Sequence, residues 1–277
     1  FHRAWHDPRP LAEAWEDGQL GRELEQDATR LLTQAFDQAL RWVIKDPRLS
    51  ILAPAWVRAT REMGAMPHCV ICVRHPIEVF KSLSHRDGLT EPHACLLWLG
   101  YFSAAVRATR GERRCIVDYD AFMAAPMPVL ADALQHLGLP VPRQSASAWK
   151  AVADSIIPQE RHHQAKEGAD TPSGLMDLAI EVYEAARGIA CGSEDWNVLE
   201  EPLRRAARAL AELGGPNHEL VKHVYMHDAR ATRYSRLVAE QLTALDLEGL
   251  HAGPRIVKEV QQLGASVSER LSQKQSE

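Results

Sequence analysis

The sequence predicts an α/β fold, with a parallel sheet flanked by helices and a helical C-terminal region after it. Three runs have the apolar, β-branched and aromatic character of strands: Trp42–Asp46, His68–Val73 and Cys115–Tyr119. Near-continuous apolar runs of this length are typical of parallel strands covered on both faces. After Pro158 no further run has strand character. We therefore expect an α/β domain over residues 1–165 and a helical region over 166–277.

Helical patterns lie between and after these strands. They cover Gly21–Arg41, Leu49–Glu62, Pro76–His85, Thr90–Arg110, Ala121–Leu137, Leu175–Ile189, Leu199–Leu213, His218–Leu245 and Arg255–Leu271. Pro76 suits the first turn of its helix, Thr90 is an expected N-cap, and Gly111 follows the end of the fourth helix. Strands that alternate with helices predict right-handed crossovers and a parallel sheet of α/β type.

Composition limits the class of protein. The 277 residues are 45% hydrophobic and 25% charged, with a net charge of −5, which is ordinary for a globular protein and argues against a nucleic-acid partner. No apolar run approaches the roughly 20 residues of a membrane span. The opening "FHRAWHDPRP" lacks the apolar core of a signal peptide. We expect a cytoplasmic protein.

The cysteines predict thiols rather than disulfides or a metal site. The chain contains Cys69, Cys72, Cys95, Cys115 and Cys191, an odd number in apolar surroundings, which indicates buried free thiols in a reducing compartment. Cys69 and Cys72 form a CxxC within an expected strand, where residues three apart point to opposite faces. His223 and His227 lie four apart, but no third ligand accompanies them. We expect no metal.

Two polar clusters follow expected strands. Lys45-Asp46-Pro47-Arg48 comes after the first strand and Arg74-His75-Pro76 after the second. In parallel sheets, ligands bind at the carboxyl ends of the strands. Arg74 at a helix N-terminus, with Ser82 further along that helix, has the character of a phosphate site. The alternative is an exposed, salt-bridging arginine and a solvated serine.

Several segments resemble a known family. "CVICVRHPIEVFKSLSHRDGL" (Cys69–Leu89) resembles the strand–loop–helix of P-loop sulfotransferases that binds the 3′-phosphate of the sulfate donor. The positions that match are Arg74, Pro76, Val79, Ser82 and His85. "CIVDYDAFMAAPMPVLADALQHLGLP" resembles a later strand and helix of the family, and "VIKDPRLSILAPAW" resembles a Lys-Asp-Pro-Arg stretch of its bacterial branch. The resemblance covers roughly residues 40–190.

The resemblance implies a three-layer, P-loop NTPase-like fold and a sulfotransferase activity. A sulfuryl group would pass from 3′-phosphoadenosine 5′-phosphosulfate, without a metal, to a hydroxyl or amine of a carbohydrate or small molecule. Arg74 and Ser82 would bind the 3′-phosphate. Asp46 is the candidate general base, and Lys45 and Arg48 would stabilise the transferring group. Alternatively, Asp46 bonds backbone N–H groups at the next helix start, and Lys45 and Arg48 form salt bridges.

One feature of the family is absent. Its members open with a strand and a Pro-Lys-Ser-Gly-Thr-Thr or His-Arg-Ser-Gly-Thr-Ser loop that cradles the 5′-phosphosulfate, and the chain contains no such loop or GxxxxGK[ST] motif. We expect that an N-terminal segment is missing; the alternative is a natural relative that lost the loop. Two other functions stay open: an inactive nucleotide-binding or helical interaction module, and a P-loop small-molecule kinase.

Overall fold

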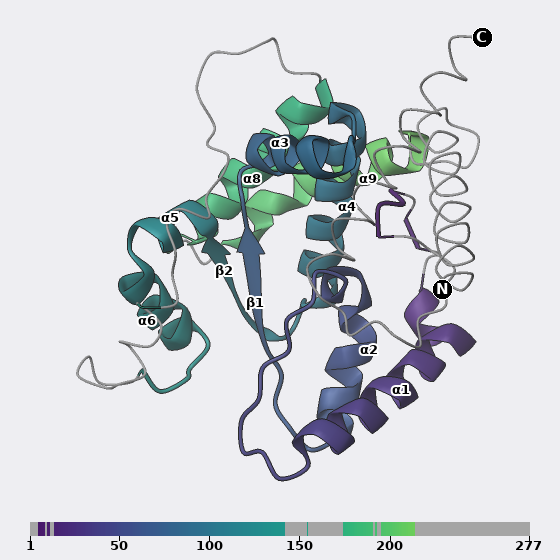
Figure 1. The fold of residues 1–277 in the computed structure, drawn as a ribbon, viewed down its shortest axis with the longest axis vertical. Helices are drawn as coiled ribbons and strands as arrows, with labels where there is room; N and C mark the ends of the chain where they lie inside the picture. Colours follow the sequence, from purple (N-terminus) through teal and green to yellow (C-terminus); the bar gives the residue numbers. More distant parts are fainter. Residues whose placement is uncertain are drawn as a thin grey trace, which may run out of the picture. The chain divides into compact units, whose positions relative to one another are not determined.

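The computed structural model describes residues 5–8, 10–11, 14–141, 154, 174–190, 192 and 195–213. In chain order the elements are 3-10 helix η1 (Trp15–Asp17), α1 (Gln19–Phe36), α2 (Leu49–Glu62), β1 (His68–Val73), α3 (Pro76–Asp87), α4 (Glu91–Ala108), β2 (Arg113–Asp118), α5 (Tyr119–Ala124), α6 (Pro126–His136), α8 (Gly174–Ala190), 3-10 helix η3 (Trp196–Leu199) and α9 (Glu200–Leu213). The described part is mixed α/β, mostly helical, with a small parallel sheet (Figure 1).

Over the described residues, the sheet consists of β1 and β2. The strands pair in parallel, from His68 opposite Arg113 to Val73 opposite Asp118. The prediction of His68–Val73 is confirmed at both ends, whereas the other strand covers Arg113–Asp118 and so begins and ends earlier than expected. The chain crosses from β1 to β2 through α3 and α4, as a parallel pair requires.

The prediction of a strand at Trp42–Asp46 is wrong. The segment does alternate, with Trp42 and Ile44 half-buried and Val43 87% exposed. Trp42 stacks on Phe36 with ring centroids 5.3 Å apart, and Trp42 and Ile44 pack against the core between α1 and α2. However, no described strand forms a backbone ladder with it. An apolar alternation produces a strand only where another strand supplies the hydrogen bonds.

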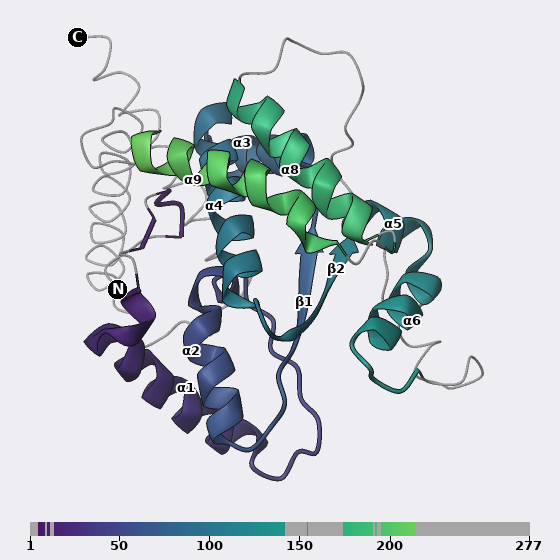
Figure 2. The ribbon, with the colours of Figure 1, turned by 180° about the vertical axis from the view of Figure 1, so that it is seen from behind.

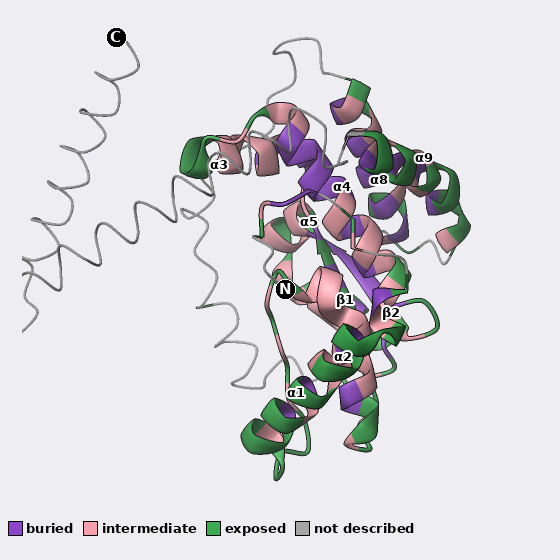
Figure 3. Cartoon of the chain, turned by 90° about the vertical axis from the view of Figure 1, so that its right-hand side faces the viewer, coloured by how far each residue is buried: buried purple, intermediate pink, exposed green. Residues whose placement is uncertain are grey.

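The main core lies between one face of the sheet and helices α4, α8 and α9. The sheet contributes Ile71, Val73 and Ile116 to this core. The helices contribute Trp98, Leu99, Phe102, Ala105, Ala179, Val182, Tyr183, Ala186, Ile189 and Ala206. Figure 2 shows α8 and α9 crossing the molecule next to α4, and Figure 3 shows the buried residues where these elements meet.

Helices α8 and α9, which follow the boundary expected near residue 165, share a core with the sheet. By its internal contacts the chain divides into two compact units, Phe1–Val224 and Tyr225–Glu277. All described residues belong to the first unit. The helices expected at His218–Leu245 and Arg255–Leu271 lie outside the described residues.

The other face of the sheet is only partly covered. Helix α6 packs on Cys115 and Val117 of β2. On the same face of β1, Val70 is 50% exposed and Cys72 is also exposed. The thiols of Cys95 and Cys115 are buried as expected, and the expectation is wrong for Cys72. Cys191 lies outside the described residues.

The helix expected at Ala121–Leu137 is divided into α5 and α6 at Ala125. Ala125 has φ −147° and ψ 72°, outside the helical region, and Pro126 follows it as the first residue of α6. A proline clashes with a helical residue before it and has no N–H to donate, so the first helix must end there. At the other end, Asp118 accepts a 2.8 Å bond from the Ala121 N–H, which starts α5 at Tyr119.

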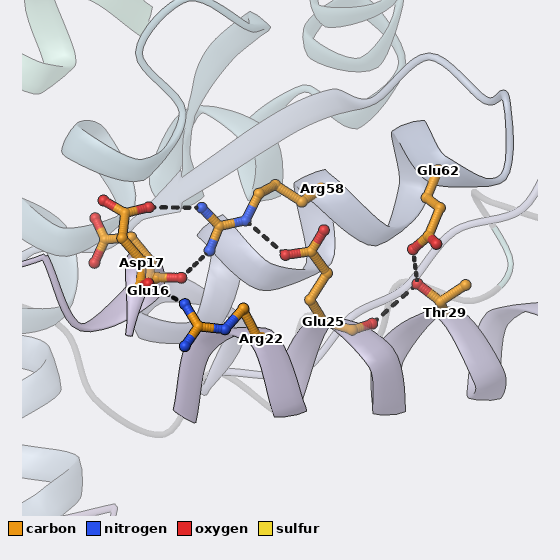
Figure 4. Close-up of polar contacts among 7 residues, drawn as sticks. All are labelled: Glu16, Asp17, Arg22, Glu25, Thr29, Arg58 and Glu62. Atoms are coloured by element: carbon orange, nitrogen blue, oxygen red, sulfur yellow. Dashed lines mark hydrogen bonds and ion pairs between the residues drawn. The ribbon is translucent and has the colours of Figure 1, made fainter. Parts of the chain in front are cut away.

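Polar contacts join α1 to α2 (Figure 4). Nη1 of Arg58 on α2 lies 3.1 Å from Oδ1 of Asp17, and its Nε lies 2.9 Å from Oε2 of Glu25 on α1. The Thr29 hydroxyl donates a 2.7 Å bond to Glu62 on α2. Arg58, Glu25 and Thr29 are half-buried, and Asp17 and Glu62 are exposed. All of these pairs remain open to solvent, so we expect each to stabilise the fold by about 1 kcal/mol or less.

Candidate functional site

The carboxyl ends of β1 and β2 lie side by side, because Val73 is the register partner of Asp118. Arg74 follows β1 directly and Tyr119 follows β2, so both residues leave the sheet at one edge. Side chains from β2, α3, α5, α8 and the β1–α3 connection interact there. We name this group the carboxyl-edge cluster: Arg74, His75, Glu78, Asp118, Tyr119 and Tyr183.

Arg74 is held from several sides. Its Nε donates a 2.9 Å hydrogen bond to Oε2 of Glu78, and its guanidinium carbon lies 4.6 Å from the centre of the Tyr119 ring. The backbone carbonyl of Arg74 accepts a 3.0 Å bond from the indole N–H of Trp98 on α4. The Arg74 side chain is 27% exposed and that of Glu78 is 1% exposed. The carboxylate is thus buried beneath an arginine that still reaches the surface.

His75 begins α3. Its Nδ1 accepts the backbone N–H of Ile77 at 3.3 Å, so the neutral ring carries its proton on Nε2. The ring lies edge-on to Tyr183, with centroids 4.9 Å apart. Burial lowers the pKa of His75, against the opposing effect of Glu78 and neighbouring carboxylates. Both effects of the fold on this ring, the helix cap and the burial, favour the uncharged form.

Asp118 connects β2 to two helices. Its Oδ1 caps α5, and its Oδ2 accepts a 2.8 Å bond from the Tyr183 hydroxyl on α8. Asp118 is 3% exposed and Tyr183 is 2% exposed. Burial, and then the bond to Asp118, raise the pKa of the Tyr183 phenol. The hydroxyl therefore stays protonated and donates to a buried carboxylate.

Ser82 lies on α3 and is half-buried. Glu78 and Ser82 are four residues apart, so they share one face of the helix, and Arg74 precedes Glu78 by the same interval. Ser82 is therefore on the side of α3 that carries Glu78, whereas Arg74 precedes the helix and reaches Glu78 through its side chain. No sequence motif had indicated Glu78.

Lys45, Asp46 and Arg48 are not at the end of a strand. Oδ1 of Asp46 accepts bonds from N of Arg48 at 2.8 Å and from Nε at 2.9 Å, and Oδ2 accepts from Nη2 at 2.6 Å. These bonds lower the pKa of Asp46 to about 2. The Cys72 residue is exposed, but partial desolvation of its thiol raises the pKa, and the charge of the exposed Lys45 opposes this rise. The structure thus brings Lys45 near β1, and Asp46 makes the backbone bond of the alternative interpretation.

A cavity of about 270 Å³ lies along β2. Its walls come from α6, α8 and η3, and they include Asp118, Asp132, His136 and Trp196. Neither Arg74 nor Ser82 lines it. Within the described ranges, no three His, Cys, Asp or Glu side chains gather as metal ligands would. His223 and His227 lie outside those ranges. No described helix is long and apolar enough to cross a membrane.

Sequence reasoning did not identify three members of the cluster. Asp118 had a local signal, since an aspartate directly before a helix is a preferred N-cap. Glu78 had the i, i+4 spacing from Arg74. Tyr183 had no signal, because its partner Asp118 is 65 positions away in the chain. Contacts of that separation depend on how the helix packs on the sheet.

Comparison of the chain with models of protein families, with curated proteins and with solved structures finds no match in any of the three.

Proposed function

We propose that this chain is the main part of a sulfotransferase that uses 3′-phosphoadenosine 5′-phosphosulfate. The acceptor is a hydroxyl or amine of a carbohydrate or small molecule. In this proposal the nucleotide's 3′-phosphate binds to Arg74 of the carboxyl-edge cluster and to Ser82 on α3. The two strands and their flanking helices would be part of a larger three-layer parallel sheet of the P-loop NTPase type.

The observation that carries the proposal is the position of Arg74. It lies between a parallel strand and the first residue of a 12-residue helix, at the sheet edge where α/β proteins bind ligands. The N-terminus of α3 carries a partial positive charge, although Pro76 has no N–H and the N–H groups of Ile77 and Glu78 already bond His75. The Arg74 guanidinium packs over the Tyr119 ring, and this contact restricts the orientation of the guanidinium. These features together suit a phosphate.

Glu78 distinguishes Arg74 from an ordinary exposed arginine, because it holds the guanidinium in place from below. Its carboxylate is 1% exposed and bonded to Nε of Arg74, so it is not a second group at the surface. The pair carries no net charge, and the helix N-terminus and Ser82 must therefore contribute to affinity for an anion. The salt bridge of Arg74 agrees with part of the alternative interpretation, which expected an exposed, salt-bridging arginine, but its partner Glu78 is almost wholly buried.

The proposed catalytic residues, Lys45, Asp46 and Arg48, lie in the segment before α2. Lys45 lies near β1 and is proposed to stabilise the transferring sulfuryl group. Asp46 with a pKa of about 2 is a weak base while Arg48 holds it. It would act as the general base only after that ion pair opens. We propose Arg48 as the residue that controls this opening.

Calorimetric titration of the 277-residue chain with adenosine 3′,5′-bisphosphate tests the binding site. We expect Arg74→Ala to weaken binding at least about tenfold, and Ser82→Ala to weaken it less, since a charged hydrogen bond contributes more than a neutral one. Arg30→Ala, which removes an exposed arginine of α1, is the matched control. Adenosine 5′-monophosphate, which lacks the 3′-phosphate, should bind the wild type about as weakly as the bisphosphate binds Arg74→Ala. Equal affinity of the wild type and Arg74→Ala would contradict the phosphate assignment.

Transfer assays separate the enzyme from its alternatives. Labelled sulfate from the donor should appear on a carbohydrate or small-molecule acceptor. Binding of the bisphosphate without any sulfuryl transfer would favour the inactive nucleotide-binding module. Transfer of labelled phosphate from ATP, and not of sulfate, would favour the small-molecule kinase.

A further inference from the structure

Tyr183 connects α8 to both strand ends of the carboxyl-edge cluster. The residue is 2% exposed and lies in the region that the sequence assigns to a separate helical part. Its hydroxyl donates a 2.8 Å bond to Asp118 at the end of β2. Its ring meets the edge of His75, just after the end of β1, with centroids 4.9 Å apart. One side chain thus contacts the residue that caps α3 and the residue that caps α5.

Each of the two capped helices carries a side chain that contacts Arg74. Asp118 caps α5, whose first residue Tyr119 lies under the Arg74 guanidinium at 4.6 Å. His75 caps α3, whose first turn carries Glu78, the partner of Arg74 Nε at 2.9 Å. The aromatic face and the carboxylate that orient Arg74 therefore depend on two caps. Tyr183 touches each of these caps directly.

We propose that Tyr183 is a positioning residue that sets the orientation of the Arg74 guanidinium through Asp118 and His75. This inference rests on the proposed function, in which Arg74 binds a phosphate. Bidentate recognition of a phosphate requires a fixed guanidinium plane, so a side chain that fixes this plane raises affinity without touching the ligand. It also makes α8 part of the binding site rather than an appendage.

Tyr183→Phe tests the proposal because it removes the hydroxyl and keeps the ring against His75. We expect the affinity for adenosine 3′,5′-bisphosphate to fall about three- to tenfold, less than for Arg74→Ala, because the change loosens the guanidinium without removing it. In an Arg74→Ala background the same change should have no further effect, because Tyr183 acts through Arg74. A role in stability alone would not give this dependence. Thr60→Val is the control, since it removes a hydroxyl of similar burial that bonds Trp56 on α2.

The outcomes separate this inference from the proposed function. If Arg74→Ala weakens binding but Tyr183→Phe does not, or does so equally in both backgrounds, the positioning role is wrong and the phosphate site stands. If the wild type does not bind the bisphosphate, or Arg74→Ala binds it equally well, both proposals are wrong. Should Tyr183→Phe fail to fold, Asp118→Asn replaces it, because asparagine still caps a helix but accepts less strongly from the phenol. The same dependence on Arg74 is expected for it.

Discussion

Oε2 of Glu78 lies 2.9 Å from Nε of Arg74, and this contact joins a carboxylate that is 1% exposed to a guanidinium that is 27% exposed. A carboxylate at this depth is costly unless it is paired and hydrogen-bonded. The pair spans the end of β1 and the first turn of α3. It therefore stabilises the fold and the orientation of Arg74 at the same time.

We expect Glu78→Ala to lower the free energy of unfolding by about 3–5 kcal/mol, because it leaves Arg74 beside a cavity without its partner. Glu78→Gln should cost about 1–3 kcal/mol, since the amide oxygen still accepts a weaker bond. Urea unfolding followed by circular dichroism measures both. Glu23→Gln, on an exposed position of α1, should change stability by less than about 0.5 kcal/mol. A Glu78→Ala effect as small as that of the control would show that the pair does not stabilise the fold.

The ion pair of Asp46 predicts a specific pH dependence. The pKa of Asp46 is about 2 in the folded chain against an ordinary 3.8, so the pair's contribution is complete above about pH 4 and is lost as the pH falls through 2. The group is partly exposed, so this contribution is below about 1 kcal/mol. The difference in unfolding free energy between wild type and Asp46→Asn, measured from about pH 7 to about pH 2, should decline only over this acid range. Arg48→Ala should raise the Asp46 pKa measured by NMR, and an unchanged value would show that Arg48 is not what lowers it.

His75 predicts a second pH dependence, in the neutral range. Burial lowers its pKa below the ordinary 6.5, so the unfolded chain binds a proton more readily than the folded one. Stability should therefore decrease as the pH falls through the ordinary value. His75→Asn keeps a side chain that caps α3 and removes the titration. The wild type should lose stability relative to His75→Asn between about pH 7.5 and about pH 5, the range of the ordinary His titration, and a constant difference would contradict the assignment.

The thiols should differ in reactivity. Burial raises the pKa of Cys115 to about 11 and that of Cys95 to about 12, and both side chains are buried. Because the thiolate is the nucleophile, neither should be alkylated in the native protein near neutral pH. Cys72 is exposed and should react before Cys95 and Cys115. Peptide mapping after iodoacetamide treatment measures this order. The unfolded chain, in which all thiols should react at similar rates, is the control, and early labelling of Cys115 would contradict the structure.

Local sequence patterns predicted much of the described fold. The boundaries of Leu49–Glu62 and His68–Val73 agree with the structure at both ends. Apolar spacing and the flanking Gly and Pro residues act over a few positions, so such elements are readable without tertiary information. The break at Pro126 was readable in the same way, from the restriction that proline places on Ala125.

The sequence by itself determined a strand that ends at Val73, directly before Arg74, and a helix that begins at Pro76, because both depend on neighbouring residues. Only the tertiary structure decided that Glu78 is buried and that Tyr183 reaches Asp118. It also decided that Trp42–Asp46 forms no strand among the described residues. A strand needs a hydrogen-bonded neighbour and a buried carboxylate needs a cation. Those partners can come from distant parts of the chain, which only packing brings together.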